Sequence, residues 1–187
     1  PGAESISVRS EIERVVPVIS ALSDEGITVS VDTSKPEVME AAVAAGASMV
    51  NDIYALRQAG ALDMAARLGV PVCLMHMQGT PATMQQAPYY ANLGKEIGEF
   101  LGSRVGPCLQ AGIERNLLLV DPGIRFGKTL AHNHTLMSQL PRFSALGVPL
   151  LIGVSRKAFV RALVQIDSEE ILDEMSALLA LLAVEQG

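Results

Sequence analysis

The 187-residue sequence contains no tryptophan, only two cysteines and 4% aromatic residues. With Cys73 and Cys108 alone it cannot form the disulfide framework of a small secreted domain, which favours a reducing compartment such as the cytoplasm. No apolar run approaches the roughly 18 residues that a membrane helix needs, so we expect no membrane insertion. The net charge of −6 argues against a general nucleic-acid binder. Any anionic ligand must therefore be held by local cations.

The rest of the sequence, 49% hydrophobic and 18% charged, is typical of a globular domain in which short apolar runs alternate with amphipathic stretches. Ser34, followed three residues later by Glu37, predicts a capping box at the start of the second helix. The predicted strands lie at 27–31, 48–50, 70–75, 117–120 and 149–154. The predicted helices lie at about 8–26, from 34 onward, 59–68, 93–111, 135–146 and from 169 to the end.

Strands separated by helices indicate a parallel sheet, and the continuous apolar runs indicate strands covered on both faces. An open doubly wound sheet and a (β/α)₈ barrel both fit this pattern. A full barrel takes about 250 residues, so five strands and six helices predict a partial TIM (β/α)₈ barrel. The sequence opens with Pro1 instead of methionine and contains no linker. We therefore expect a single domain over 1–187, truncated at both ends.

Polar residues follow each predicted strand. Asp32, Asn51, His76 and Asp121 stand at the first four strand ends, and a Ser-Arg-Lys run at 155–157 follows the fifth. In parallel α/β folds these positions share the C-terminal edge of the sheet, where ligands bind. Helix capping is the alternative role for such residues. Caps do not require two carboxylates and a lysine, so the whole set favours a ligand site.

Two other motifs point elsewhere. The segment from Gly123 to Thr129 ends in Gly-Lys-Thr like a phosphate-binding Walker loop, but only three residues separate Gly123 from Gly127, where that motif has four. His132 and His134 suggest a metal site, but no third ligand lies nearby in the sequence. We therefore expect neither a nucleotide-hydrolysing loop nor a metal centre here.

The ordered set of strand-end motifs resembles that of dihydropteroate synthases, and the resemblance covers essentially the whole sequence. Each motif alone is common, but their order and spacing are specific. The matching segments are Val31-Asp32-Thr33-Ser34-Lys35-Pro36, Asn51-Asp52-Ile53, Cys73-Leu74-Met75-His76-Met77-Gln78-Gly79, Asp121-Pro122-Gly123 through Phe126-Gly127-Lys128, and Ser155-Arg156-Lys157.

The resemblance implies that one end of the barrel binds a pterin. Four residues would hydrogen-bond the ring: Asp32, Asn51, Asp121 and Lys157. A pterin presents an amino group beside a ring nitrogen, and carboxylate and amide oxygens accept from such donors. The other implied substrate-binding residues are Met75 packing on the ring, Ser155 contacting p-aminobenzoate, Phe126 on the flanking loop, and Arg156.

The implied reaction condenses 6-hydroxymethyl-7,8-dihydropterin diphosphate with p-aminobenzoate, releasing diphosphate, in folate biosynthesis. Asp32, Asp121 and Lys157 would be the catalytic residues, because fixed carboxylates stabilise the positive charge that develops as diphosphate leaves. The family uses Mg²⁺ with the diphosphate and forms homodimers. A methyltetrahydrofolate-dependent methyltransferase of the same superfamily and a non-catalytic pterin-binding protein are the alternatives.

The sequence also departs from the family pattern. The family's opening strands with the Mg²⁺-binding Asn loop, and its last strand with a diphosphate site, lie outside it. We therefore expect this piece alone to keep much of the pterin pocket but little catalytic activity. Asp173 and Glu174 stand where small residues are usual. Arg125 replaces a glycine, and if the position needs a positive φ the arginine costs of order 1 kcal/mol.

Overall fold

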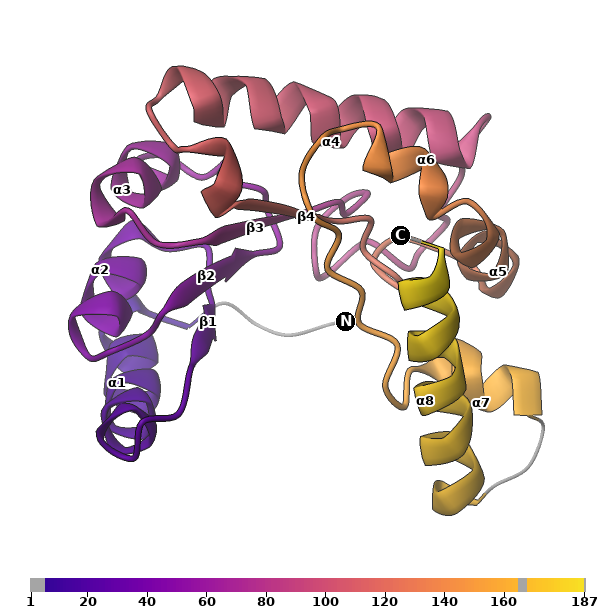
Figure 1. Cartoon of the computed structure of the whole chain (residues 1–187), viewed down its shortest axis with the longest axis horizontal. Helices are drawn as coiled ribbons and strands as arrows, with labels where there is room; N and C mark the ends of the chain where they lie inside the picture. The colour runs from indigo at the N-terminus through magenta and orange to yellow at the C-terminus, as the bar shows by residue number, and fades with distance from the viewer. Residues whose placement is uncertain (1–5, 165–167, 187) are drawn as a thin grey trace.

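The computed structural model describes residues 6–164 and 168–186, which form a parallel four-stranded sheet in the order β1-β2-β3-β4 with helices around it (Figure 1). The strands are β1 (Ser30–Asp32), β2 (Met49–Asp52), β3 (Val72–Met75) and β4 (Leu118–Asp121). The α-helices are α1 (Val8–Asp24), α2 (Pro36–Ala44), α3 (Ala61–Leu68), α4 (Leu93–Gln110), α5 (Leu130–Ser138), α6 (Pro141–Ser144), α7 (Ala158–Val164) and α8 (Glu169–Glu185), and a 3₁₀ turn, η1 (Arg115–Leu117), precedes β4.

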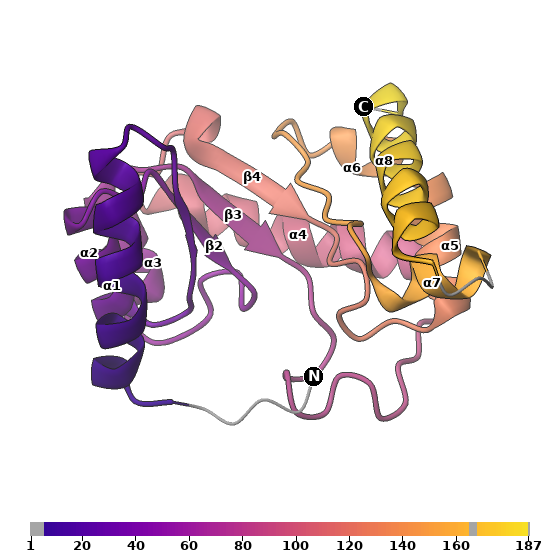
Figure 2. The same ribbon diagram turned by 90° about the horizontal axis from the view of Figure 1, so that it is seen from below.

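One face of the sheet is packed against helices. Along β1 to β4, every second residue on this face is an aliphatic core residue, such as Val31, Val50 and Val72. Their partners come from α2, α3 and α4, for example Met39 and Ile97. Figure 2 shows these helices on the outer side of the strands. No helix in the described part of the chain is long and apolar enough to cross a membrane.

The opposite face carries the polar strand-end residues. The register pairs Asp32 with Asn51 and Asn51 with Cys73 across the first three strands. On β3 and β4, Met75 pairs with Asp121. Paired residues point to the same face, as do residues two apart on one strand. Asp32, Asn51, Met75 and Asp121 therefore all project from the face that the helices leave uncovered.

The prediction of a fifth strand at 149–154 is wrong. The segment makes a single bridge, Val120 to Leu150, with the backbone hydrogen bonds Val120 N to Pro149 O at 3.0 Å and Leu151 N to Val120 O at 2.9 Å. Pairing goes no further in the described structure. Gly153 follows, and glycine weakens strand pairing because it adds backbone entropy and has no side chain to pack.

The predicted helix at 135–146 is also wrong in its bounds. It starts earlier, at Leu130, because Thr129 accepts a hydrogen bond from His132 N while the His132 side chain accepts from Thr129 N, which completes a capping box. It stops at Ser138, and Pro141 begins the separate short helix α6. Proline lacks the N–H needed to continue a helix but fits a first turn.

Two further expectations about the helices fail. Ser34 forms no capping box, because Lys35 is the N-cap and Pro36 takes the first helical position, which leaves Glu37 one position too early. Helix α7 was not predicted. With it, and with the split of the 135–146 helix, the described residues form four strands and eight α-helices instead of five and six.

Candidate functional site

Asn51 provides the clearest sign of a ligand on the uncovered face. Its Oδ1 is buried and has no hydrogen-bond partner among the described residues. A buried carbonyl oxygen without a partner costs about 1–3 kcal/mol, so such atoms are rare unless something else satisfies them. Asn51 stands beside Asp32 in register, so the unpaired acceptor adjoins a carboxylate. This face of the sheet therefore presents acceptors to a ligand that donates hydrogen bonds.

Asp121 is 5% exposed at the end of β4. Its Oδ1 accepts a 2.7 Å hydrogen bond from Gly123 N, which fixes the carboxylate against the turn that follows. Burial raises the pKa of Asp121, while the Gly123 N–H, Lys157 and Lys128 oppose this change. The negative charge of Asp32 also reaches Asp121 and raises its pKa. The two carboxylates also project from the same face of the sheet.

Lys157 lies on the same side. Its Nζ donates to Ile124 O at 2.9 Å and stands 5.6 Å from the centre of the Phe126 ring. Burial lowers the pKa of Lys157, Asp121 counteracts this, and the positive charge of Arg125 adds to the lowering. A lysine held this way can donate to an acceptor on a ring that also meets Asp121.

Behind this group lies a buried pair that the sequence did not predict. Lys128 is 3% exposed, and its Nζ is 3.0 Å from His76 Nδ1 and donates to Phe126 O at 2.9 Å. Burial lowers the pKa of Lys128 to about 7, although Asp121 opposes the change. Burial and the nearby Lys128 lower the pKa of His76 to about 3. The pair, 52 residues apart, ties the loop after β4 to the end of β3.

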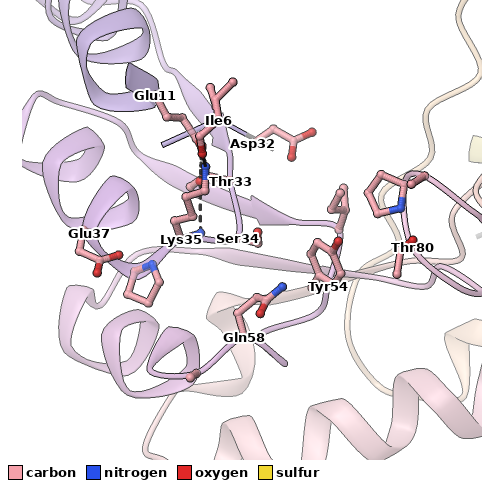
Figure 3. A pocket seen from close by; sticks show the side chains of 15 residues that line it. Ile6, Glu11, Asp32, Thr33, Ser34, Lys35, Glu37, Tyr54, Gln58 and Thr80 are labelled. Atoms are coloured by element: carbon pink, nitrogen blue, oxygen red, sulfur yellow. Dashed lines mark hydrogen bonds and ion pairs between the residues drawn. The ribbon is translucent and has the colours of Figure 1, made fainter. Parts of the chain in front are cut away.

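Asp32 stands at the other edge of the group, on the rim of a cavity of about 1150 Å³. Figure 3 shows its carboxylate directed away from the contact between Glu11 and Lys35. Thr33 also donates to Glu11. Sequence patterns gave no sign of this cluster, because Glu11 is a polar position of α1, 24 residues before Lys35. Burial and the nearby Glu11 raise the pKa of Asp32.

Asp32, Asn51, Asp121 and Lys157 form what we call the polar group. Only Asp32 among them also lines the cavity. Asn51, Asp121 and Lys157 do not line the cavity, which is bounded by the ends of β1 and β2 and by residues 80–82. The shared face, the unpaired Asn51 oxygen and the electrostatic coupling of the two aspartates are specific to the polar group. We therefore place the candidate site there, with the cavity as its neighbour.

The helix-capping alternative does not explain these residues. The residue that caps α2 is Lys35, and the N-cap of α5 is Thr129, so neither Asp32 nor Asp121 takes this role. Asp52 is the structural exception. It is fully buried and accepts from the amides of Tyr54 and Leu56, both at 2.8 Å, which shapes the turn after β2.

The remaining predicted residues lie around the group. Met75 is buried and clusters with Met77 and Met84, and Phe126 packs against them. Ser155 is exposed after the bridged segment. The Arg156 side chain is held by α8 through a two-point contact with Asp173, with both N–O distances 2.6 Å. The substrate-binding role of Arg156 stays a prediction.

Arg125 has φ 81°, so the glycine-like conformation considered from the sequence is present. The left-handed region costs a side-chain-bearing residue about 1–2 kcal/mol. Arg156 has φ 49° but gains ion pairs with Asp173 and Glu169. No ion pair involves Arg125 in the described structure.

Replacing Arg125 by glycine should therefore raise the free energy of unfolding by roughly 0.5–1 kcal/mol, the relieved strain less the extra unfolded-state entropy of glycine. Urea denaturation at unchanged m-value would measure the gain. Arg156→Gly is the matched control and should not stabilise, because it also removes the contacts with α8. A loss of stability in Arg125→Gly would contradict the strain assigned to this residue.

Known proteins resemble this chain in sequence and fold. The family model described as pterin binding enzyme matches residues 1–187. The dihydropteroate synthase of Escherichia coli K12 is 44% identical over 188 residues, covering 100% of this chain and 66% of its own length. The chain thus spans about two thirds of that curated relative.

Two solved structures from Xanthomonas albilineans are similar over 100% of this chain. Dihydropteroate synthase with 4-aminobenzoic acid has a TM-score of 0.92 at 47% identity, with 67% of its chain covered. The same enzyme in complex with 7,8-dihydropteroate has a TM-score of 0.90 at 46% identity, with 68% covered. Since these are TIM barrels, the unclosed four-stranded sheet is part of such a barrel, as the sequence predicted. The chain belongs to the pterin-binding enzyme family.

Proposed function

We propose that the protein is a dihydropteroate synthase, which joins 6-hydroxymethyl-7,8-dihydropterin diphosphate to p-aminobenzoate. The observation that carries the proposal is the buried, unpaired Oδ1 of Asn51, which lies on the same face as Asp32 and Asp121. The aminopyrimidinone edge of a pterin supplies adjacent N–H donors that match these acceptors. The 44% identity to a curated enzyme of this name supports the same activity.

The two carboxylates fit the chemistry of the transfer. The aniline nitrogen attacks the methylene carbon, the carbon–oxygen bond to diphosphate breaks with both electrons leaving on oxygen, and the nitrogen then loses a proton to solvent. Positive charge develops on the pterin as the bond breaks. Asp121 is buried and fixed by the Gly123 N–H, so its negative charge would stabilise that positive charge more in the transition state than in the ground state.

The test is diphosphate release by the intact protein that carries this chain. With the pterin diphosphate present, release should require p-aminobenzoate, and dihydropteroate should form in equal amount. Diphosphate release or methyl transfer independent of the arylamine would favour a different enzyme of the superfamily. Pterin binding without turnover in the intact protein would identify a non-catalytic binding protein.

We propose that Mg²⁺ acts with the substrate diphosphate instead of being held by these residues. Within residues 6–164 and 168–186, no three His, Cys, Asp or Glu side chains form a metal site. Mg²⁺ commonly binds through substrate phosphates with few protein ligands. The residues described here thus do not by themselves fit a magnesium site, and no step above depends on one.

We also propose a cytoplasmic homodimer. Both cysteines are buried as free thiols, which suits a reducing compartment. Helix α8 exposes Leu178, Leu181 and Val184, with 48%, 56% and 77% of each residue's surface accessible, and a second copy would cover this apolar face. Leu181→Glu in the intact protein should shift sedimentation from dimer toward monomer. An unchanged dimer would show that the subunits meet elsewhere.

A further inference from the structure

Arg125 adopts its left-handed conformation because its surroundings impose it. Its backbone N–H donates to Asn133 Oδ1 at 2.7 Å, and its carbonyl accepts from the Gln85 side chain. Asn133 is 3% exposed and is itself fixed by a 2.8 Å hydrogen bond from Nδ2 to Thr129 O. The loop is thus held from two sides with its strained residue in place. Strain of this kind accumulates at functional sites, which directs attention to the side chain.

The Arg125 side chain is an exposed cation on the loop that follows β4. In the part of the chain that the structure describes, its guanidinium forms no ion pair, whereas Arg156 is paired with Asp173 and Glu169. Lys157 donates to Ile124 O, and Lys128 is bonded within the protein. The Arg125 side chain is exposed and lines a cavity of about 250 Å³ together with Lys128 and Phe159. Ile124, whose carbonyl accepts from Lys157, directly precedes Arg125, so Arg125 lies beside the candidate site.

Two anionic groups would enter this site under the proposed function, a diphosphate and the carboxylate of the arylamine. A diphosphate carries several charges and needs several donors. One guanidinium matches one carboxylate in a two-point contact. Arg125 also adjoins Phe126, whose ring stands 5.6 Å from Lys157 Nζ and can flank a planar aromatic acid. The arylamine carboxylate is therefore the better match.

We propose that Arg125 is a specificity-determining residue that pairs with the carboxylate of the aminobenzoate substrate and so favours it over uncharged arylamines. The inference rests on the proposed function. It predicts that the protein discriminates between p-aminobenzoate and p-aminobenzamide, which has nearly the same shape without the charge. The discrimination should depend on Arg125 and should not change when an exposed cation far from this loop is removed.

The experiment measures kcat/KM for both arylamines with the intact wild-type protein, Arg125→Gly, Arg125→Lys and the control Arg14→Gln. Arg14 is exposed on α1 and tests loss of one positive charge far from the loop. In Arg125→Gly the preference for the benzoate over the benzamide should fall about 10–100-fold, mainly through KM, as expected for a lost hydrogen-bonded ion pair. Arg125→Lys should keep part of the preference, and Arg14→Gln should keep all of it.

The outcomes separate the inference from the proposed function. Turnover with an unchanged preference in Arg125→Gly overturns the inference alone, as does an equal fall for both arylamines, which would indicate a change of loop shape. A preference lost equally in Arg14→Gln also overturns it, because the general field of the protein would then be responsible. If the intact wild-type protein uses neither arylamine, the proposed function fails and the inference with it.

Discussion

Replacing Gly123 by alanine should destabilise the fold by about 2–5 kcal/mol, because two penalties act together. A Cβ at this position would lie 1.9 Å from the carbonyl oxygen of His76, which is backbone and cannot swing aside. Gly123 also has φ 73°, in the region that favours glycine. Relief of the contact would move the turn that holds Asp121, so ligand binding should suffer as well.

Urea denaturation would measure the loss, with Gly69→Ala as the matched control. Gly69 has φ 62°, but nothing lies within 4 Å of the position a Cβ would take. The control should therefore cost only about 1 kcal/mol, the backbone penalty alone. Equal losses in the two variants would show that the close approach to His76 does not constrain the loop.

The second large effect concerns Asp121. Asp121→Asn keeps the shape and one acceptor oxygen but removes the charge, so pterin affinity should weaken by about 1–3 kcal/mol, or roughly 5–150-fold. Calorimetric titration with a pterin would measure it in the intact protein. Asp63→Asn, an exposed change on α3, should leave the affinity as it is. Unchanged affinity in Asp121→Asn would remove this residue from the pterin site.

Local sequence patterns were enough to predict the four strands and their polar ends. Parallel strands necessarily end at one edge of the sheet, which brings Asp32, Asn51 and Asp121 to that edge. The register shows that they also share a face. The expectation of strands covered on both faces is wrong for β1, whose Ser30 and Asp32 are exposed. The strain at Arg125 was also anticipated from the motif, and its φ of 81° confirms the condition.

What the sequence could not show depends on contacts between distant segments. The fifth strand failed because an apolar run becomes a strand only where neighbours continue the pairing, and here only Leu150 bridges to β4. The contact of Arg156 with Asp173 and the pair of Lys128 with His76 join residues 17 and 52 apart. No local periodicity records such contacts.

Pterin recognition at this site requires that hydrogen-bond acceptors on the uncovered face of the sheet meet the donor edge of one heterocycle. Calorimetric titration of the intact protein with 6-hydroxymethylpterin and with the matching lumazine tests this directly, because lumazine carries a carbonyl where the pterin has its amino group. We expect the lumazine to bind at least about 100-fold more weakly, because its carbonyl oxygen would face the acceptor oxygens of the site where the pterin amino group donates. Equal affinities would contradict the recognition of a pterin by Asp32, Asn51 and Asp121.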